Sequence, residues 1–180
     1  MYGNGIELRG KTLGIIGFGR IGKETAKIAL GIGMNVIASD PVVQSSVITL
    51  DFFNGQKISI AIDTISKQEV LKEADFITIH TPSQNKYLID ESDIEMMKNN
   101  VGIINTSRGS VLNEVALVNA IEQGKVIFAG LDVFEKEPTP EIQLLMNPEL
   151  SLTPHIGAAT KEAQERIGAE LALQIVQLLS

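Results

Sequence analysis

Three glycines stand between an apolar run and an amphipathic stretch near the amino end of the chain. They form the pattern Gly17-x-Gly19-x-x-Gly22, after the strand-like run 12–16 and at the start of a helical pattern from Arg20 to Ile32. In such a turn the first glycine permits a tight bend, the second lets a pyrophosphate approach the backbone, and the third lets the helix pack closely on the strand. Because free N–H groups at a helix start attract phosphate, the pattern predicts a dinucleotide site. The alternative is a glycine turn without a ligand.

An acidic residue follows the next apolar run. That run is Met34–Ala38, which reads as a second strand, and Asp40 comes directly after it. Its distance from the glycines, about 20 residues, is that of the acid which binds the adenosine ribose in dinucleotide sites. A carboxylate there accepts hydrogen bonds from the ribose hydroxyls and repels a 2′-phosphate. The sequence therefore predicts NAD rather than NADP as the cofactor.

Composition and charge restrict the function classes further. The chain has 180 residues, a formal net charge of −7 and no cysteine. This length suits one domain, predicted here over residues 1–180. The acidic balance argues against a nucleic-acid partner, and the lack of cysteine excludes disulfides and thiolate ligands, so we predict no metal site. No apolar run approaches the roughly 18 residues of a membrane span and no signal-peptide pattern is present, so we expect a cytoplasmic protein without a membrane partner.

Short apolar runs alternate with helical patterns along most of the chain. Further strands are predicted at 76–80, 101–105, 126–131 and 150–153, and helices at about 67–73, 90–98, 113–123, 140–146 and 160–179. This alternation predicts an α/β fold of the Rossmann type, a doubly wound parallel sheet with helices on both faces. Ligands bind such sheets at the carboxyl ends of the strands.

One segment breaks the alternation. Two period-2 runs within 47–62 flank Asn54-Gly55, and this pairing predicts a small inserted β-hairpin. The hairpin either covers an edge of the sheet or contributes to the adenosine end of the cofactor site or to a subunit contact.

Three residues whose side chains could take part in catalysis follow three different strands. They are Arg108, Glu137 and His155, and loops after parallel strands meet at one edge of the sheet. Together they suit reduction of a 2-oxo acid: the guanidinium binds the carboxylate, the imidazole passes a proton to the carbonyl oxygen, and the glutamate fixes the imidazole tautomer. Taken singly, each has a plainer interpretation, as a solvated arginine, a surface glutamate and a turn residue.

Two further residues at strand ends have open roles. His80 has no evident acidic partner in the sequence, and we assign it to structure. Asp132 either caps a turn or binds a nicotinamide carboxamide.

Five segments in order resemble the D-isomer-specific 2-hydroxyacid dehydrogenase family, over essentially the whole chain. They are 10–22, 74–82, 105–109, 130–138 and 153–158, and the steps from Arg108 to Glu137 and on to His155 fit the family's Arg/Glu/His trio. The resemblance implies that Arg20 and Ile21 contact the pyrophosphate. It gives the full set of cofactor-binding residues as Gly17, Gly19, Arg20, Ile21, Gly22, Asp40, Thr81, Thr106, Ser107, Arg108, Asp132, His155, Ile156, Gly157 and Ala158.

The resemblance also implies the catalytic roles. Arg108 binds the substrate carboxylate, His155 donates and accepts the proton, and Glu137 is its partner. Thr81 lines the adenosine side, whereas Thr106, Ser107 and Asp132 hold the nicotinamide half. The hairpin around Asn54-Gly55 is longer than the family's usual connection.

In this family the cofactor domain is inserted into a substrate domain built from both chain ends, so the chain resembles a cofactor domain alone. Family members commonly dimerise through it, which makes a homodimer our expectation. Within the family, the stretch 160–168 resembles members that act on a phosphorylated 2-hydroxy acid, and this resemblance implies such a substrate, with glyoxylate, hydroxypyruvate and lactate types as alternatives. A NAD-sensing module, as in corepressors related to the family, is a second alternative.

Overall fold

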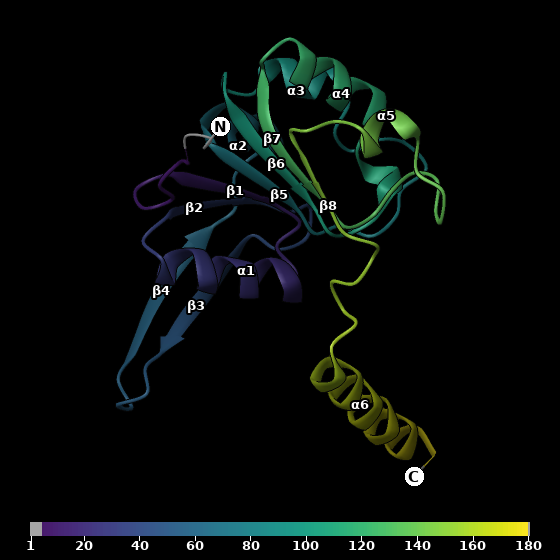
Figure 1. The fold of residues 1–180 in the computed structure, drawn as a ribbon. Helices are drawn as coiled ribbons and strands as arrows, with labels where there is room; N and C mark the ends of the chain where they lie inside the picture. The colour runs from purple at the N-terminus through teal and green to yellow at the C-terminus, as the bar shows by residue number, and fades with distance from the viewer. Residues whose placement is uncertain (1–4, 180) are drawn as a thin grey trace.

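The computed structural model describes residues 5–179, and these build one parallel sheet and a separate hairpin (Figure 1). The ends of the predicted domain, residues 1–4 and 180, lie outside the described residues. Within the described range the sheet has the strand order β2-β1-β5-β6-β7-β8. These strands are β1 (Thr12–Ile16), β2 (Asn35–Ser39), β5 (Phe76–Ile79), β6 (Val101–Asn105), β7 (Val126–Leu131) and β8 (Leu150–Leu152). The order reverses between β1 and β5, which places a ligand-binding crevice at their carboxyl ends.

Helices cover both faces of the sheet. They are α1 (Arg20–Gly31), α2 (Lys67–Glu73), α3 (Glu91–Met96), α4 (Glu114–Glu122) and α5 (Ile142–Leu145), with a 3-10 turn at Gly109–Val111. The remaining helix, α6 (Lys161–Leu179), does not cover the sheet. Along β1, Leu13 and Ile15 pack in a cluster with Ala26 of α1, whereas Ile16 packs in a second cluster with Val70 of α2. Alternate residues of one strand therefore serve opposite faces. The predicted doubly wound sheet with helices on both faces is confirmed.

Several predicted boundaries were wrong by a few residues. The second strand begins at Asn35 rather than Met34, because the Met34 N–H donates to the Ala29 carbonyl and closes the end of α1. α1 accordingly ends at Gly31, one residue before the predicted Ile32. α3 and α5 are also shorter than their predicted ranges, 90–98 and 140–146. Helix ends are the positions where a hydrophobic pattern carries least information, because capping decides them.

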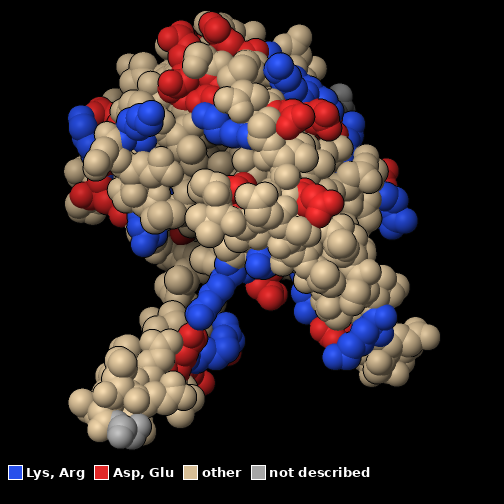
Figure 2. All heavy atoms as spheres, turned by 180° about the vertical axis from the view of Figure 1, so that it is seen from behind, with Lys and Arg blue, Asp and Glu red and all other residues tan. Residues whose placement is uncertain are grey.

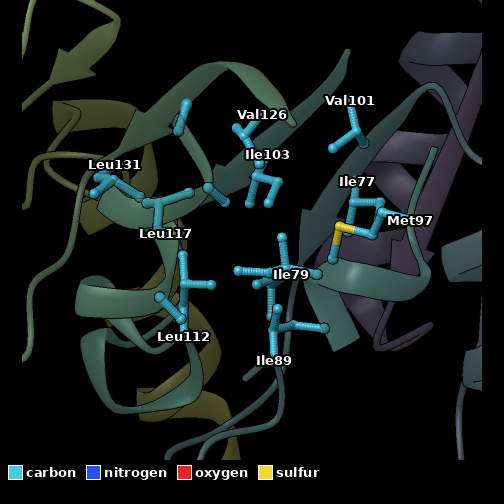
Figure 3. Packing of buried hydrophobic residues seen from close by; sticks show 14 of the residues in the cluster. Ile77, Ile79, Ile89, Met97, Val101, Ile103, Leu112, Leu117, Val126 and Leu131 are labelled. Atoms are coloured by element: carbon cyan, nitrogen blue, oxygen red, sulfur yellow. The ribbon is translucent and has the colours of Figure 1, made fainter. Parts of the chain in front are cut away.

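The larger core cluster fixes the strands whose ends carry the candidate site. Ile77 and Ile79 of β5 and Val101 and Ile103 of β6 are fully buried, and they pack with Leu117 of α4 (Figure 3). Burying an aliphatic side chain of this size contributes about 1.5–3 kcal/mol. The loops that follow these strands therefore start from a rigid platform.

The predicted hairpin is confirmed, with longer strands than the 47–62 segment suggests. β3 (Ser45–Asp51) pairs antiparallel with β4 (Lys57–Asp63), and Gly55 at the turn adopts a φ of 84°. Ile48 and Ile62 are buried in the cluster that includes α1 and β2. The base of the hairpin thus covers the β2 edge of the sheet, while its tip projects away from the body (Figure 1).

α6 stands apart from the sheet (Figure 1). Within the described range none of its residues is buried. No helix within residues 5–179 is long and apolar enough to cross a membrane. Acidic and basic side chains are interspersed over the face of the molecule seen in Figure 2.

Candidate active site

The turn after β1 is crowded at two of its three glycines. Gly17 has a φ of 95°, and a Cβ there would lie 2.4 Å from the carbonyl oxygen of His80. A Cβ on Gly22 would lie 2.2 Å from the carbonyl oxygen of Gly17. The positive φ at Gly17 and the close approach of a backbone oxygen at both positions exclude a side chain, so both glycines serve the backbone itself.

Gly19 is different, because a Cβ there would meet no described atom within 4 Å. It is the N-cap of α1, which has no side-chain cap hydrogen bond and no acidic residue in its first turn. The first N–H groups of a helix need acceptors and attract anions. Open space at an uncapped helix start is therefore a fit for the pyrophosphate of a dinucleotide.

A cleft of about 750 Å³ adjoins this helix start and is lined by residues that include Gly17, Gly19, Asp40 and Thr81. The Thr81 Oγ1 atom is buried and is without a hydrogen-bond partner among the described residues. Leaving a buried hydroxyl unpaired costs about 1–3 kcal/mol. A ligand that bonds Thr81 would recover this cost, so the cleft and the predicted residues fit a dinucleotide.

Asp40 is engaged by the chain's own backbone. Its two carboxylate oxygens accept hydrogen bonds from the N–H groups of Phe18 at 2.7 Å, Val42 at 2.8 Å and Val43 at 2.9 Å. Burial acts to raise the pKa of Asp40, but these three bonds and the charge of Lys23 lower it overall. Asp40 thus remains charged and joins the glycine turn to the loop after β2. The sequence signal for this second role is an aspartate that begins a turn.

Arg20 and Ile21 lie at the start of α1, and both are exposed. Arg20 Nη1 donates to Glu170 Oε1 of α6 at 2.9 Å, between side chains that are 87% and 51% exposed. Exposed pairs of this kind are worth about 0–1 kcal/mol, so the guanidinium stays available to a stronger anion.

His80 lies on the wall of the same cleft. Its Nε2 atom is 3.0 Å from Thr78 Oγ1 and 3.3 Å from Thr25 Oγ1, and burial lowers its pKa. A neutral imidazole between two hydroxyls joins β5 to α1, in agreement with the structural assignment.

Glu137 and His155 meet, although they come from the loops after β7 and β8. His155 Nδ1 and Glu137 Oε2 are 2.8 Å apart, and Glu137 Oε1 accepts a hydrogen bond from the Phe134 N–H at 3.0 Å. The bond to His155, followed by the bond from Phe134, lowers the pKa of Glu137. The His155 side chain is 49% exposed, so its ring remains accessible. A charged carboxylate on one ring nitrogen orients an imidazole for proton transfer through the other.

Asp132 holds the loop that carries His155. Its side chain is buried, and its oxygens accept hydrogen bonds from Thr153 Oγ1 and from the N–H groups of Ile156 at 2.8 Å and Gly157 at 2.7 Å. His155 itself has a φ of 55°, in the left-handed region. Residues other than glycine adopt it when surrounding bonds impose it. The predicted contact of Asp132 with a nicotinamide carboxamide stays a prediction.

Replacing Asp132 by asparagine should lower the free energy of unfolding by about 1–3 kcal/mol at pH 7, because the side-chain amide cannot accept both N–H bonds. Burial acts to raise the pKa of Asp132, but its hydrogen bonds lower it below 3.8 overall. Its contribution is therefore fully present above about pH 4 and is lost as the pH falls through the folded-state value. Urea unfolding of both proteins, at pH 7 and in acid, measures the difference in their free energies of unfolding. A difference that does not shrink in acid would contradict the stabilising role of the ionised Asp132.

Arg108 lies on a loop that Asn105 shapes. Asn105 Oδ1 accepts from the Ser107 N–H at 3.1 Å and from Ser107 Oγ at 2.9 Å, while Asn105 Nδ2 donates to the Arg108 carbonyl at 2.9 Å. Thr106 and Arg108 are exposed, and Ser107 is buried. The role of Asn105 in shaping this loop was not predicted from the sequence. The sequence feature that indicates it is an asparagine that begins a turn directly after a strand.

The guanidinium of Arg108 donates to the Ser107 carbonyl at 2.6 Å. Within residues 5–179 it forms no hydrogen bond or ion pair with Glu137 or His155, so the predicted trio is only partly assembled by direct contact. Its loop nevertheless lies against the loop of Glu137, because a Cβ on Gly109 would lie 1.9 Å from the carbonyl of Phe134. Beside Glu137 and His155 lies a mainly apolar pocket of about 450 Å³, completed by Phe134, Pro138, Pro140, Leu145, Leu152, Thr153 and Pro154.

The chain is similar in sequence to proteins with established names. It is 44% identical over 180 residues to the hydroxypyruvate reductase of Thermotoga maritima, covering 97% of this chain and 55% of that protein. It is 42% identical over 175 residues to the D-3-phosphoglycerate dehydrogenase of Bacillus subtilis, covering 96% of this chain and 32% of that protein. The chain therefore spans about half, or less, of the length of these relatives.

The fold also matches solved structures. The D-lactate dehydrogenase of Aquifex aeolicus, complexed with NAD and lactic acid, superposes with a TM-score of 0.76 at 32% identity, over 97% of this chain and 54% of that one. The sequence model described as D-isomer specific 2-hydroxyacid dehydrogenase, NAD binding domain, matches residues 2–157. Since this match covers most of the chain and all five motifs begin within it, the chain belongs to the D-isomer specific 2-hydroxyacid dehydrogenase family and carries its NAD-binding domain.

Proposed function

We propose that this chain is the cofactor-binding domain of an enzyme that oxidises 3-phosphoglycerate to 3-phosphohydroxypyruvate, a step of serine biosynthesis. The family consists of NAD-dependent oxidoreductases that act on the CH–OH group of 2-hydroxy acids. The observation that carries the proposal is the contact of 2.8 Å between Glu137 and His155, beside the loop of Arg108. A carboxylate aligned on an exposed imidazole is the arrangement that proton transfer requires.

Each residue has a defined task in this reaction. NAD, when bound, supplies the hydride acceptor. Arg108 binds the substrate carboxylate in a forked hydrogen bond and holds the neighbouring carbon in place. His155 takes the hydroxyl proton as the carbonyl forms, and Glu137 stabilises the resulting imidazolium. Asp132 fixes the loop on which His155 sits, and the reverse reaction uses the same groups.

The choice of substrate rests on the relatives. The Bacillus subtilis protein is named a D-3-phosphoglycerate dehydrogenase, which supports the phosphorylated acid. The Thermotoga maritima protein is named a hydroxypyruvate reductase, which supports the glyoxylate and hydroxypyruvate alternative, and the Aquifex aeolicus structure supports a lactate type. A NAD-sensing module is the remaining alternative, and the Glu137–His155 contact argues for chemistry instead.

The test is NADH oxidation by a full-length protein that contains this chain. The substrates are 3-phosphohydroxypyruvate, hydroxypyruvate, glyoxylate and pyruvate, with the isolated chain as the control. We expect the highest kcat/KM for the phosphorylated acid and little or no turnover by the chain alone, which contributes only part of the substrate site. A preference for one of the other acids would move the assignment to that acid. Turnover by the chain alone at the full-length rate would show that the site is complete within it.

We further propose that the protein acts in the cytoplasm as a homodimer formed through this domain. Exposed apolar side chains of α6, including Ile167, Leu171 and Val176, support a contact of this helix with the second copy of the chain. Light scattering of the full-length protein and of this chain should give twice the monomer mass for both. A monomeric chain would place the interface elsewhere.

The charge of Asp40 should set the cofactor preference. We expect NADPH to bind at least tenfold more weakly than NADH, because its 2′-phosphate would meet this carboxylate. Replacing Asp40 by asparagine should reduce the difference in affinity between NADH and NADPH, and it should also weaken the hydrogen bonds from the N–H groups of Phe18 and Val43. Titration calorimetry with both cofactors, at a temperature where circular dichroism shows the variant folded, measures the ratio. An unchanged ratio would contradict the role.

A further inference from the structure

The loop that carries Glu137 is held by a second pair of acidic residues. Glu114 is the first residue of α4, and Glu135 lies two positions before Glu137. The Glu135 N–H donates to Glu114 Oε1 at 2.7 Å, and the Glu114 N–H donates to Glu135 Oε1 at 3.0 Å. Each residue thus binds the backbone of the other with its own carboxylate, which joins the start of α4 to the loop after β7.

A third residue completes this contact from another loop. The Tyr87 hydroxyl donates to Glu135 Oε2 at 3.0 Å, so both oxygens of Glu135 are bonded. Tyr87 belongs to the segment after β5, in which Leu88 and Ile89 also donate backbone N–H bonds to the carbonyl of Val111. The side chain of Glu135 therefore connects the loops that follow three neighbouring strands, β5, β6 and β7.

The position of Glu137 depends on this segment. The Phe134 N–H donates a hydrogen bond to Glu137 Oε1. The backbone of Phe134 and Glu135 lies close to Gly109, where a Cβ would be 1.9 Å from the Phe134 carbonyl and 2.4 Å from the Glu135 nitrogen. Glu137 itself is exposed. Its alignment on His155 therefore rests on hydrogen bonds to the loop rather than on burial.

Burial raises the pKa of Glu114, and the charges of Glu135, Glu141 and Glu137 raise it further, against the hydrogen bond from Glu135. Placing these acids together opposes the ionised form of Glu114. At a functional site, such an unfavourable placement of charges persists when the hydrogen bonds it allows hold a segment in one geometry.

We propose that Glu135 is a positioning residue for the acid–base pair, holding Glu137 against His155 through its bonds to Glu114 and Tyr87. This inference rests on the proposed function of Glu137 and His155. Glu135 touches neither cofactor nor substrate in this account and acts only through Glu137.

Two substitutions separate hydrogen bonding from charge. Glu135→Gln removes the charge but keeps both contacts, because its amide oxygen accepts from Glu114 and its NH₂ donates to the Tyr87 oxygen. Tyr87→Phe removes one hydrogen bond and leaves every carboxylate in place. Glu135→Ala removes the charge and both side-chain contacts, to the Glu114 N–H and to Tyr87, and keeps only the bond from the backbone N–H of residue 135 to Glu114.

The readout is kcat of the full-length enzyme, compared with its KM for NADH. Glu137→Gln should lower kcat, because it removes the carboxylate that stabilises the imidazolium. Glu135→Ala should lower kcat about tenfold while the KM for NADH stays constant, because the partner of His155 is then misplaced. Tyr87→Phe should fall between Glu135→Ala and the unsubstituted enzyme, and Glu135→Gln should match the unsubstituted enzyme.

The outcomes distinguish the inference from the function on which it rests. An unchanged kcat in Glu135→Ala, or equal losses of kcat in Glu135→Ala and Glu135→Gln, would overturn the positioning role. If Glu135→Ala does not fold, an unchanged kcat in Tyr87→Phe would overturn it alone. An unchanged kcat in Glu137→Gln would instead refute the acid–base pair.

Discussion

Replacing Gly17 by alanine should destabilise the domain by about 3 kcal/mol or more, whereas Gly19→Ala should leave its stability nearly unchanged and abolish NADH binding. Gly17 has a φ of 95°, and its Cβ would lie 2.4 Å from the His80 carbonyl oxygen. The left-handed conformation and the overlap with a backbone atom both oppose the substitution. Neither the turn after β1 nor the start of the loop after β5 can move without disturbing buried strands.

Gly19 is the matched control for the same substitution. A Cβ there would meet no described atom within 4 Å, so the folded chain accommodates it. The added methyl group would occupy the space at the start of α1 that we assign to the pyrophosphate. Urea unfolding and fluorescence titration with NADH measure the two properties separately. Wild-type NADH affinity in Gly19→Ala would show that the phosphates do not approach this turn.

The second large effect concerns the acid–base pair. In the full-length enzyme His155→Gln should lower kcat by about 10²–10⁴, because the imidazole is the group that we assign to proton exchange. The dissociation constant for NADH should change little, since the imidazole acts on the substrate. Glu137→Gln should lower kcat by a smaller factor, because the amide keeps one contact to His155 but does not stabilise the imidazolium.

Rapid-mixing kinetics and NADH fluorescence titration separate these quantities. Leu145→Ala is a suitable control, since it alters the apolar pocket beside the pair and leaves both Glu137 and His155 in the sequence. A His155→Gln enzyme with kcat within about twofold of the wild type would mean that proton exchange uses another group or is not rate-limiting.

Local patterns in the sequence determined much of the fold. The alternation of apolar runs with helical patterns predicted the parallel sheet, and Asn54-Gly55 predicted the hairpin of β3 and β4. Because loops after parallel strands share one edge of the sheet, Arg108, Glu137 and His155 were expected to meet. Glu137 and His155 do, at 2.8 Å, whereas the Arg108 guanidinium bonds the Ser107 carbonyl instead. These inferences need only periodicity and topology.

Contacts between side chains and distant backbone were not predictable. Asp132 accepts N–H bonds from residues 24 and 25 positions away, and Glu114 and Glu135 are 21 positions apart. Nothing in local periodicity shows which carboxylate will bind which N–H group, because the choice depends on the final packing of the loops. The ion pair between the side chains of Arg20 and Glu170 was not predictable either, since it depends on where α6 lies.

The most direct test of the account is transfer of deuterium from NADH that carries two deuterium atoms at C4 of the nicotinamide. The full-length enzyme is given 3-phosphohydroxypyruvate, and the product is analysed by mass spectrometry and chiral chromatography. We predict one deuterium at C2 of a D-2-hydroxy acid, with the product absent or strongly reduced in His155→Gln. An L product, or a product without deuterium at C2, would contradict hydride transfer to a 2-oxo acid at this site.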